Sequence, residues 1–267
     1  MKHSLRVFSF LVLALASIVG LLAQESREVH KSGPFSKDGR LFVDTYKGTV
    51  EVTTWDKPEI DITARIEAEG SDRRSRESVQ DTEVRIDLSS NSARVKTDYD
   101  RVRRHHDGFF GLFSFESDDL PMVHYNIRVP RKANVEVKDY KSKTFMSDLE
   151  SDIVIDSYKG DIEIKRLSGS LDLKTYKGKA RVDVTNLEGR SRIETYKGET
   201  EVSLPKGKGF DLDAEIGKGA RLRSDFELEK DGSRKRNKGY DIRVAVNGGG
   251  PVVRLKCDKG TVRLLER

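Results

Sequence analysis

The sequence predicts an all-β protein: a single-stranded parallel β-helix (β-solenoid) with coils of 18 to 20 residues, which we expect to be right-handed. Three observations predict this class. A short motif recurs at a nearly constant spacing, apolar and polar residues alternate between its copies, and the charges at equivalent positions alternate in sign. The length of 267 residues allows one or two domains, and the hydrophobic fraction of 35% is too low for a membrane protein.

Residues 1–23 have the pattern of a secretory signal peptide. Lys2 and Arg6 precede an almost wholly apolar run that ends at Leu22, followed by Ala23 at the expected cleavage site. The run is shorter than the roughly 20 residues that a spanning helix needs, so an uncleaved anchor is the less favoured alternative. We expect residues 24–267 to be exported as one domain without a transmembrane segment, to the periplasm, the cell surface or the medium.

The motif Thr/Ser-Tyr-Lys-Gly organises the chain. It occurs at residues 45–48, 157–160, 175–178 and 195–198, with a degenerate copy, Asp-Tyr-Lys-Ser, at 139–142. Tyr140, Tyr158, Tyr176 and Tyr196 are 18, 18 and 20 residues apart. A fixed period of this length is typical of repeated structural units, and glycine at the end of the motif allows the positive φ of a tight corner.

Between the corners, apolar and charged residues alternate with a period of two, which predicts strands. The apolar positions include Ile153 and Ile155, Ile162 and Ile164, Leu171 and Leu173, Val182 and Val184, and Val202 and Leu204. A meander of hairpins and a parallel solenoid would both show this period.

The charges favour the solenoid. The residues two positions before each tyrosine are Lys138, Asp156, Lys174 and Glu194, and those three positions after it are Lys143, Asp161, Lys179 and Glu199. In an in-register parallel stack, such residues lie roughly 4.8 Å apart, where opposite charges attract and like charges repel. A meander places them two strands apart and has no reason to keep the alternation.

The remaining elements follow in chain order. Residues 41–68 contain the first motif copy and two further strands, 71–76 form a charged turn or loop, and 83–88, 93–97 and 123–129 are strands. Residues 130–134 form a turn before the array. After the array, 229–239 form a basic loop, 248–251 a glycine-rich corner, and 252–265 the last coil.

Residues 99–120 break the pattern and form an excursion from the coil. Its aromatic centre consists of Phe109, Phe110, Phe113 and Phe115. We favour a cap that folds back over an open end of the solenoid, because an unpaired end strand invites aggregation. The alternative is an exposed loop that docks on a partner or a membrane surface. The neighbouring pair His105 and His106 is interpreted as solvated loop residues and not as a metal site.

The tandem Thr-Tyr-Lys-Gly corners, the turn at Val129–Pro130, and the segments 248–251 and 257–260 together resemble one known family. This is the bacterial family of adhesin-like domains of unknown function, also called Toastrack domains. The resemblance covers roughly residues 40–267 and departs from the family at the corner, which there usually reads Thr-Val-Asn-Gly. It implies a parallel β-helix in an envelope or extracellular setting, and it brings no catalytic residue and no cofactor.

The sequence predicts a binding or scaffold protein and not an enzyme. It has no zinc-protease, phosphate-loop, nucleophile-elbow or dinucleotide motif. The net charge of +5 falls to +3 without the leader, which argues against nucleic-acid binding. An envelope polymer or an envelope protein is the expected partner. The alternative is a polysaccharide-processing enzyme on the same scaffold.

The candidate ligand site is a row of tyrosines and lysines at the corners. Its members are Tyr140, Lys141, Tyr158, Lys159, Tyr176, Lys177, Tyr196 and Lys197. Exposed rings would stack on sugar rings while the ammonium groups meet phosphate or carboxylate. The other interpretation is architectural, with the tyrosines turned inward as a buried stack and the lysines splayed into water.

Overall fold

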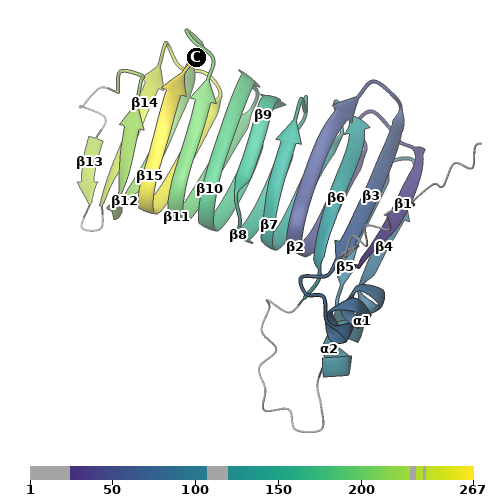
Figure 1. Cartoon of the computed structure of the whole chain (residues 1–267). Helices are drawn as coiled ribbons and strands as arrows, with labels where there is room; N and C mark the ends of the chain where they lie inside the picture. The colour runs from purple at the N-terminus through teal and green to yellow at the C-terminus, as the bar shows by residue number, and fades with distance from the viewer. Residues whose placement is uncertain (1–24, 107–119, 229–232, 237–238) are drawn as a thin grey trace, which may run out of the picture.

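The structure of the chain, a computed structural model, describes residues 25–106, 120–228, 233–236 and 239–267. These residues form one long sheet that is wound into stacked turns, with two short helices at one corner (Figure 1). The predicted all-β class is confirmed. No helix among these residues is long and apolar enough to cross a membrane.

In the first part of the chain, the elements are β1 (Ser26–Pro34), β2 (Arg40–Trp55), β3 (Glu59–Glu67), α1 (Arg73–Asp81), β4 (Glu83–Leu88), β5 (Ser92–Asp98), α2 (Asp100–His106) and β6 (Met122–Pro130). The repeat region contains β7 (Asn134–Ser147), β8 (Ile153–Lys159), β9 (Ile162–Gly169), β10 (Leu171–Leu187) and β11 (Arg190–Leu204). The chain ends with β12 (Phe210–Ser224), β13 (Ser233–Arg236), β14 (Gly239–Val246) and β15 (Val252–Glu266).

The strands of the repeat region are parallel and in register. Lys174 on β10 lies opposite Asp156 on β8 and Glu194 on β11, as the alternating charges predict. Each long strand passes through the corner without a break, so that its first half belongs to one face of the molecule and its second half to another. Leu173 and Val182 on the two halves of β10 both point into the core and are buried.

Two segments do not stack in the order of the sequence. We expected residues 252–265 to form the last coil, but β15 lies between β11 and β12 and is parallel to both. In one row the charges fit this order, because Lys256 on β15 separates Glu194 from Glu215. At the other end, β2 lies between β7 and the pair β5 and β6.

Three predicted loops contain regular structure. Residues 71–76, expected to form a loop, include the start of α1, where the Asp72 side chain accepts a hydrogen bond from the Ser75 backbone N–H at 2.9 Å. Such an N-cap stabilises a helix that lacks a long apolar face. His105 and His106 end α2 and are not loop residues. The basic segment 229–239 includes the short strand β13.

Glycine is required at the corners because neighbouring turns of the chain approach closely there. Gly178 has φ +152°, and a Cβ at this position would overlap the backbone carbonyl oxygen of Gly160 in the previous turn. Gly198 meets Gly178, and Gly260 meets Gly198, in the same way. Gly189 also has positive φ, +63°, but nothing lies within 4 Å of its missing Cβ. The corner glycines are therefore fixed by packing as well as by backbone conformation.

This difference predicts the cost of two alanine substitutions. We expect Gly178→Ala to lower the free energy of unfolding by about 3 kcal/mol, because it adds a steric overlap to an unfavourable φ. The control Gly189→Ala should cost only about 1 kcal/mol, since it meets the conformational penalty alone. Urea denaturation followed by circular dichroism measures both values, and equal losses would contradict the close approach at the corner.

Candidate functional site

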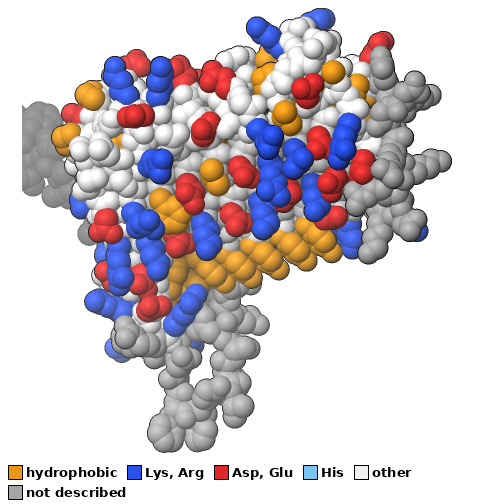
Figure 2. Space-filling view, turned by 180° about the vertical axis from the view of Figure 1, so that it is seen from behind, with side chains coloured by type: hydrophobic (Ala, Val, Ile, Leu, Met, Phe, Trp, Pro, Cys, Tyr) orange, Lys and Arg blue, Asp and Glu red, His pale blue; other side chains and the backbone are white. Residues whose placement is uncertain are grey.

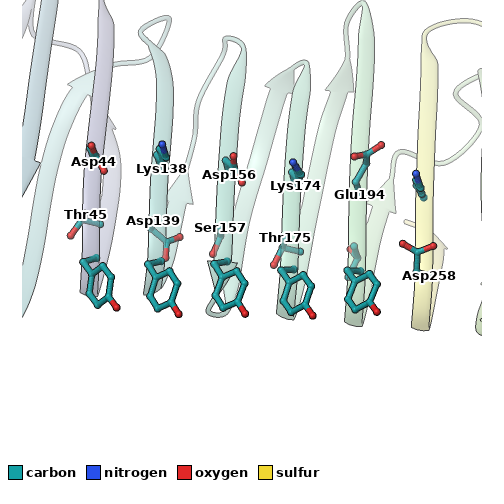
Figure 3. Close-up of a pocket in the computed structure, with 17 residues that line it drawn as sticks. Asp44, Thr45, Lys138, Asp139, Asp156, Ser157, Lys174, Thr175, Glu194 and Asp258 are labelled. Atoms are coloured by element: carbon teal, nitrogen blue, oxygen red, sulfur yellow. The ribbon is translucent and has the colours of Figure 1, made fainter. Parts of the chain in front are cut away.

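The corners bring five tyrosines into one continuous stack. Neighbouring rings have centroids 4.6 to 4.8 Å apart and interplanar angles of 3° to 11°, in the order Tyr46, Tyr140, Tyr158, Tyr176, Tyr196. We call this stack the tyrosine ridge. Its rings form the unbroken apolar stripe at the lower edge of the molecule in Figure 2 and the row of rings in Figure 3.

Each end of the ridge has a different neighbour. Beyond Tyr46, the ring of Tyr99 packs edge-on, with centroids 6.2 Å apart and an interplanar angle of 71°. Beyond Tyr196, the corner of β15 has Asp258 in place of a tyrosine, and the Lys259 ammonium lies 5.7 Å from the centroid of the Tyr196 ring. Both ends thus meet a cation, because the Arg103 guanidinium lies 5.9 Å from the centroid of the Tyr46 ring, and only the Tyr46 end has an aromatic neighbour as well.

Four of the five rings are exposed at the surface, and the fifth, Tyr46, is half-buried against the core. Tyr140 and Tyr196 are 38% exposed, and Tyr158 and Tyr176 are 44% exposed. Because each ring covers the faces of its neighbours, a ligand reaches ring edges and hydroxyl groups only. The expectation that ring faces stack on sugar rings is therefore wrong, since the 4.7 Å spacing of the strands leaves no room between the rings.

The lysines of the motif follow one flank of the ridge. The strand registers place Lys47 opposite Lys141, and Lys177 opposite both Lys159 and Lys197. Lys159, Lys177 and Lys197 are exposed, and a shallow groove of about 280 Å³ lies between the tyrosines and lysines of three successive corners. We call this set of side chains the lysine row.

Lys47 belongs to the same row but is buried. Its Nζ lies 2.6 Å from a carboxylate oxygen of Glu69 and within 3.4 Å of the Leu120 carbonyl oxygen. The sequence does not predict Tyr46 and Lys47 as site residues, although they belong to the motif copy at 45–48. Only the position of β2 beside β7 shows that this copy continues the row.

A second, larger groove of about 690 Å³ follows the other flank of the ridge. Its outer wall is the row of alternating charges two residues before the ridge, visible in Figure 3. The predicted alternation extends further than the repeat, because Asp44 on β2 faces Lys138 and Lys256 on β15 faces Glu194. This wall consequently carries no excess of either charge.

Small polar side chains lie beneath this groove and point into the coil. They are Thr45, Asp139, Ser157, Thr175 and Thr195, all buried. Asp139 Oδ1 accepts a hydrogen bond from the backbone N–H of Ser142 at 2.8 Å, which gives this buried carboxylate a partner in the degenerate motif copy. Burial nevertheless raises the pKa of Asp139 to about 6, with a smaller contribution from the charge of Asp156.

The carboxyl groups of this groove differ in burial. Asp139 is buried beneath the groove, whereas Asp44, Asp156 and Glu194 stand in its wall. Burial raises the pKa of the Cys257 thiol to about 11, which keeps it protonated and unreactive. Within the described ranges, no cluster of His, Cys, Asp and Glu is arranged to hold a metal ion.

The described parts of the excursion lie at a corner. Tyr99, Val102 and Leu120 are buried there, in the gap between β5 and β6, and the Tyr99 hydroxyl donates to the Pro121 carbonyl oxygen at 2.9 Å. The predicted aromatic centre of Phe109, Phe110, Phe113 and Phe115 lies outside the described residues. The cap therefore stays a prediction.

Comparisons with known proteins agree with this architecture. A family model described as Toastrack DUF4097 matches residues 125–264. The crystal structure of a candidate cell adhesion protein from Clostridium sporogenes is 12% identical to this chain, with a TM-score of 0.50 over 91% of this chain and 100% of its own. A candidate adhesin from Bacteroides fragilis is 10% identical, with a TM-score of 0.42 over 90% of this chain and 97% of its own. The likeness to the Clostridium sporogenes protein shows the fold alone. No curated protein matches the sequence.

The buried Asp139 predicts a pH-dependent stability. Its pKa is raised on folding, so the folded state holds the proton more tightly, and the stability from this group falls as the pH rises from about 4 to about 6. The variant Asp139→Asn has no titratable group at this position, so its unfolding free energy does not fall with pH for this reason. Relative to the parent protein, the variant should gain about 2 kcal/mol in unfolding free energy between pH 4 and pH 7. Urea titrations at both pH values measure this change, and a constant difference between the two proteins would contradict it.

Proposed function

The chain belongs to the Toastrack DUF4097 family, and from this premise we propose that it is a non-enzymatic, adhesin-like protein of the cell envelope that binds anionic polymers along the lysine row. The observation that carries the proposal is the in-register row of like charges beside an exposed ridge. Lys159, Lys177 and Lys197 follow one another at the strand spacing, with no acidic residue between them in the row.

Such a row has an electrostatic cost that a ligand can remove. Like charges directly opposite each other on neighbouring strands repel, and the rows on either side of the motif avoid this repulsion by alternation. Phosphate or carboxylate groups placed along the row would neutralise it. The charge pattern therefore supports a polyanion and not a neutral or basic ligand.

The geometry supports a linear ligand. The groove between ridge and lysines passes several successive corners, so a polymer lying along it would contact many ammonium groups at once. Each contact alone is weak at an exposed site, but contacts within one chain add up through their high effective concentration. The tyrosine hydroxyls at the ring edges would donate hydrogen bonds to the same ligand.

We further propose the features of this protein that the sequence predicts and on which its location depends. Residues 1–23 would act as a signal peptide, and residues 24–267 would form one exported domain, at the cell surface or in the periplasm. The stack would be a right-handed solenoid with coils of 18 to 20 residues. Parallel registers such as Leu173 opposite both Ile155 and Ile193 support this coil length.

A binding experiment tests the function. Purified protein is pelleted with insoluble cell-wall material and titrated with a panel of anionic glycans at low and moderate salt. We expect binding that weakens with salt, because exposed charges are screened beyond a Debye length of about 10 Å at 0.1 M. Replacement of Lys141, Lys159, Lys177 and Lys197 by glutamine should abolish most of it.

The matched control removes the same number of charges elsewhere. Lys143, Lys179, Lys206 and Lys208 are exposed and lie outside the lysine row, so their replacement by glutamine should preserve most of the binding. Equal losses of binding in the two variants would mean that binding depends on the net charge of the protein and not on the lysine row. Unchanged binding by the lysine-row variant would refute the proposed site.

A further inference from the structure

The flat face that ends at the tyrosine ridge carries rows of charges of both signs. It is built from the strand halves before the corner, and Figure 2 shows its interleaved basic and acidic side chains above the ridge. Pairing runs in the order β4, β5, β2, β7, β8, β10, β11, β15, β12 and β14. We call it the charged face. Its inner row is in register with Lys174, and its outer row with Asp172.

The inner row is antisymmetric in charge about the midpoint between β8 and β10. Asp156 and Lys174 are the first residues on either side of this midpoint. The second are Lys138 on β7 and Glu194 on β11, and the third are Asp44 on β2 and Lys256 on β15. At each distance from the midpoint, the two sides carry opposite charges.

The antisymmetry continues beyond the repeat. At the fourth position, Lys96 on β5 corresponds to Glu215 on β12. At the fifth, Arg85 on β4 corresponds to Asp241 on β14. These strands have no Thr-Tyr-Lys-Gly motif, so the sequence repeat alone does not produce the pattern.

The outer row follows the same rule wherever both sides are charged. Glu136 corresponds to Arg192, Arg94 to Asp213, and Asp87 to Arg243. The two remaining positions combine a charged with an uncharged side chain: Val154 with Asp172, and Phe42 with Arg254. No position in either row pairs like charges.

This pattern is what a two-fold interface requires. Consider two copies that meet face to face, related by a two-fold axis that lies in the interface and runs parallel to the strands. Each row of one copy then lies on the same row of the other copy, with the order of the strands reversed. Every inner-row residue then faces the residue at the same distance on the other side of the midpoint. All such contacts in the inner row join an acid to a base, and the outer row adds three more.

The tyrosine ridge fits the same arrangement. Its midpoint also lies between β8 and β10, so that Tyr158 would face the partner's Tyr176, and Tyr140 the partner's Tyr196. At the ends, Tyr46 would face the Asp258 carboxylate of the partner subunit, which can accept a hydrogen bond from the phenol. The exposed apolar stripe would be partly covered.

From this complementarity we propose that the charged face binds a second copy of this chain. The two copies form a two-fold dimer that is centred between β8 and β10 and in which the strand orders run in opposite directions. A second copy has the same strand spacing, so the charges stay matched along the whole face. The inner row contains five basic and five acidic residues, and thus offers a polyanion no net attraction. The dimer uses the flank of the ridge opposite the lysine row, and it shares with the proposed polymer site only the tyrosine ridge between the two flanks.

A charge-exchange experiment tests the dimer. Lys174→Glu creates two acid–acid contacts in the symmetric dimer, because residues 156 and 174 face each other twice. Asp156→Lys creates two base–base contacts. We expect sedimentation velocity to show a dimer for the parent protein at micromolar concentration, and a dissociation constant raised about tenfold or more for each variant alone. An equal mixture of the two variants should dimerise again, because both contacts then join opposite charges.

Lys179→Glu is the matched control. It makes the same change on the same strand, between the acids Asp161 and Glu199, but after the corner and outside the charged face. It should dimerise as the parent does. Thermal melts of all variants separate a loss of folding from a loss of association.

A monomeric parent protein would overturn the proposal. So would a Lys174→Glu variant that dimerises like the parent, or a mixture of the two variants that stays monomeric. Binding to anionic glycans is measured on the same samples. Because Lys174 lies outside the lysine row, a failure of the dimer and a failure of polymer binding are distinguishable.

Discussion

In-register parallel stacking is the constraint on which the rest of this structure depends. Each residue of a repeat lies next to its equivalents in the neighbouring turns, about one strand spacing away. A residue type that recurs at one position of the repeat therefore forms a row of neighbouring side chains. Rows of apolar residues make the core, rows of glycine allow the corners to touch, and a row of tyrosine becomes a continuous stack of rings. Within β7 to β11, the charged rows on either side of the corner motif alternate in sign, and the lysine row does not.

The parts of the fold that follow from this constraint could be predicted from the sequence. The spacing of Tyr140, Tyr158, Tyr176 and Tyr196, together with the alternation of Lys138, Asp156, Lys174 and Glu194, indicates the parallel neighbours that the structure contains. The parts that depend on topology could not. Nothing local in residues 252–265 shows that β15 inserts before β12, where Lys256 lies between two acids.

The candidate site, too, could be predicted from the sequence only in part. The motif identified its residues, except for Tyr46 and Lys47, whose copy is separated from the others by about 90 residues of sequence and joins them only in space. The direction of the rings was left open by the sequence, because the alternation of inward and outward residues is interrupted at a corner. The structure places them outward with their faces covered, and this changes the chemistry from ring stacking to hydrogen bonding and charge.

The ridge consequently divides two surfaces of different character. On one flank, like charges in register favour a polyanion. On the other flank, charges that are balanced and antisymmetric favour a second copy of the chain. The same strand spacing produces both, and the difference lies only in which residues the sequence places in each row.

Nuclear Overhauser contacts between tyrosine rings test the stacking most directly, with assignments made by single Tyr→Phe substitutions. In-register stacking predicts ring contacts between Tyr158 and Tyr176 and between Tyr140 and Tyr158. It also predicts a contact between Tyr46 and Tyr140, which are close only if β2 lies in register beside β7. A meander would separate each such pair by two strands. Absence of the Tyr46–Tyr140 and Tyr158–Tyr176 contacts in a folded sample would contradict in-register stacking, and with it both proposed surfaces.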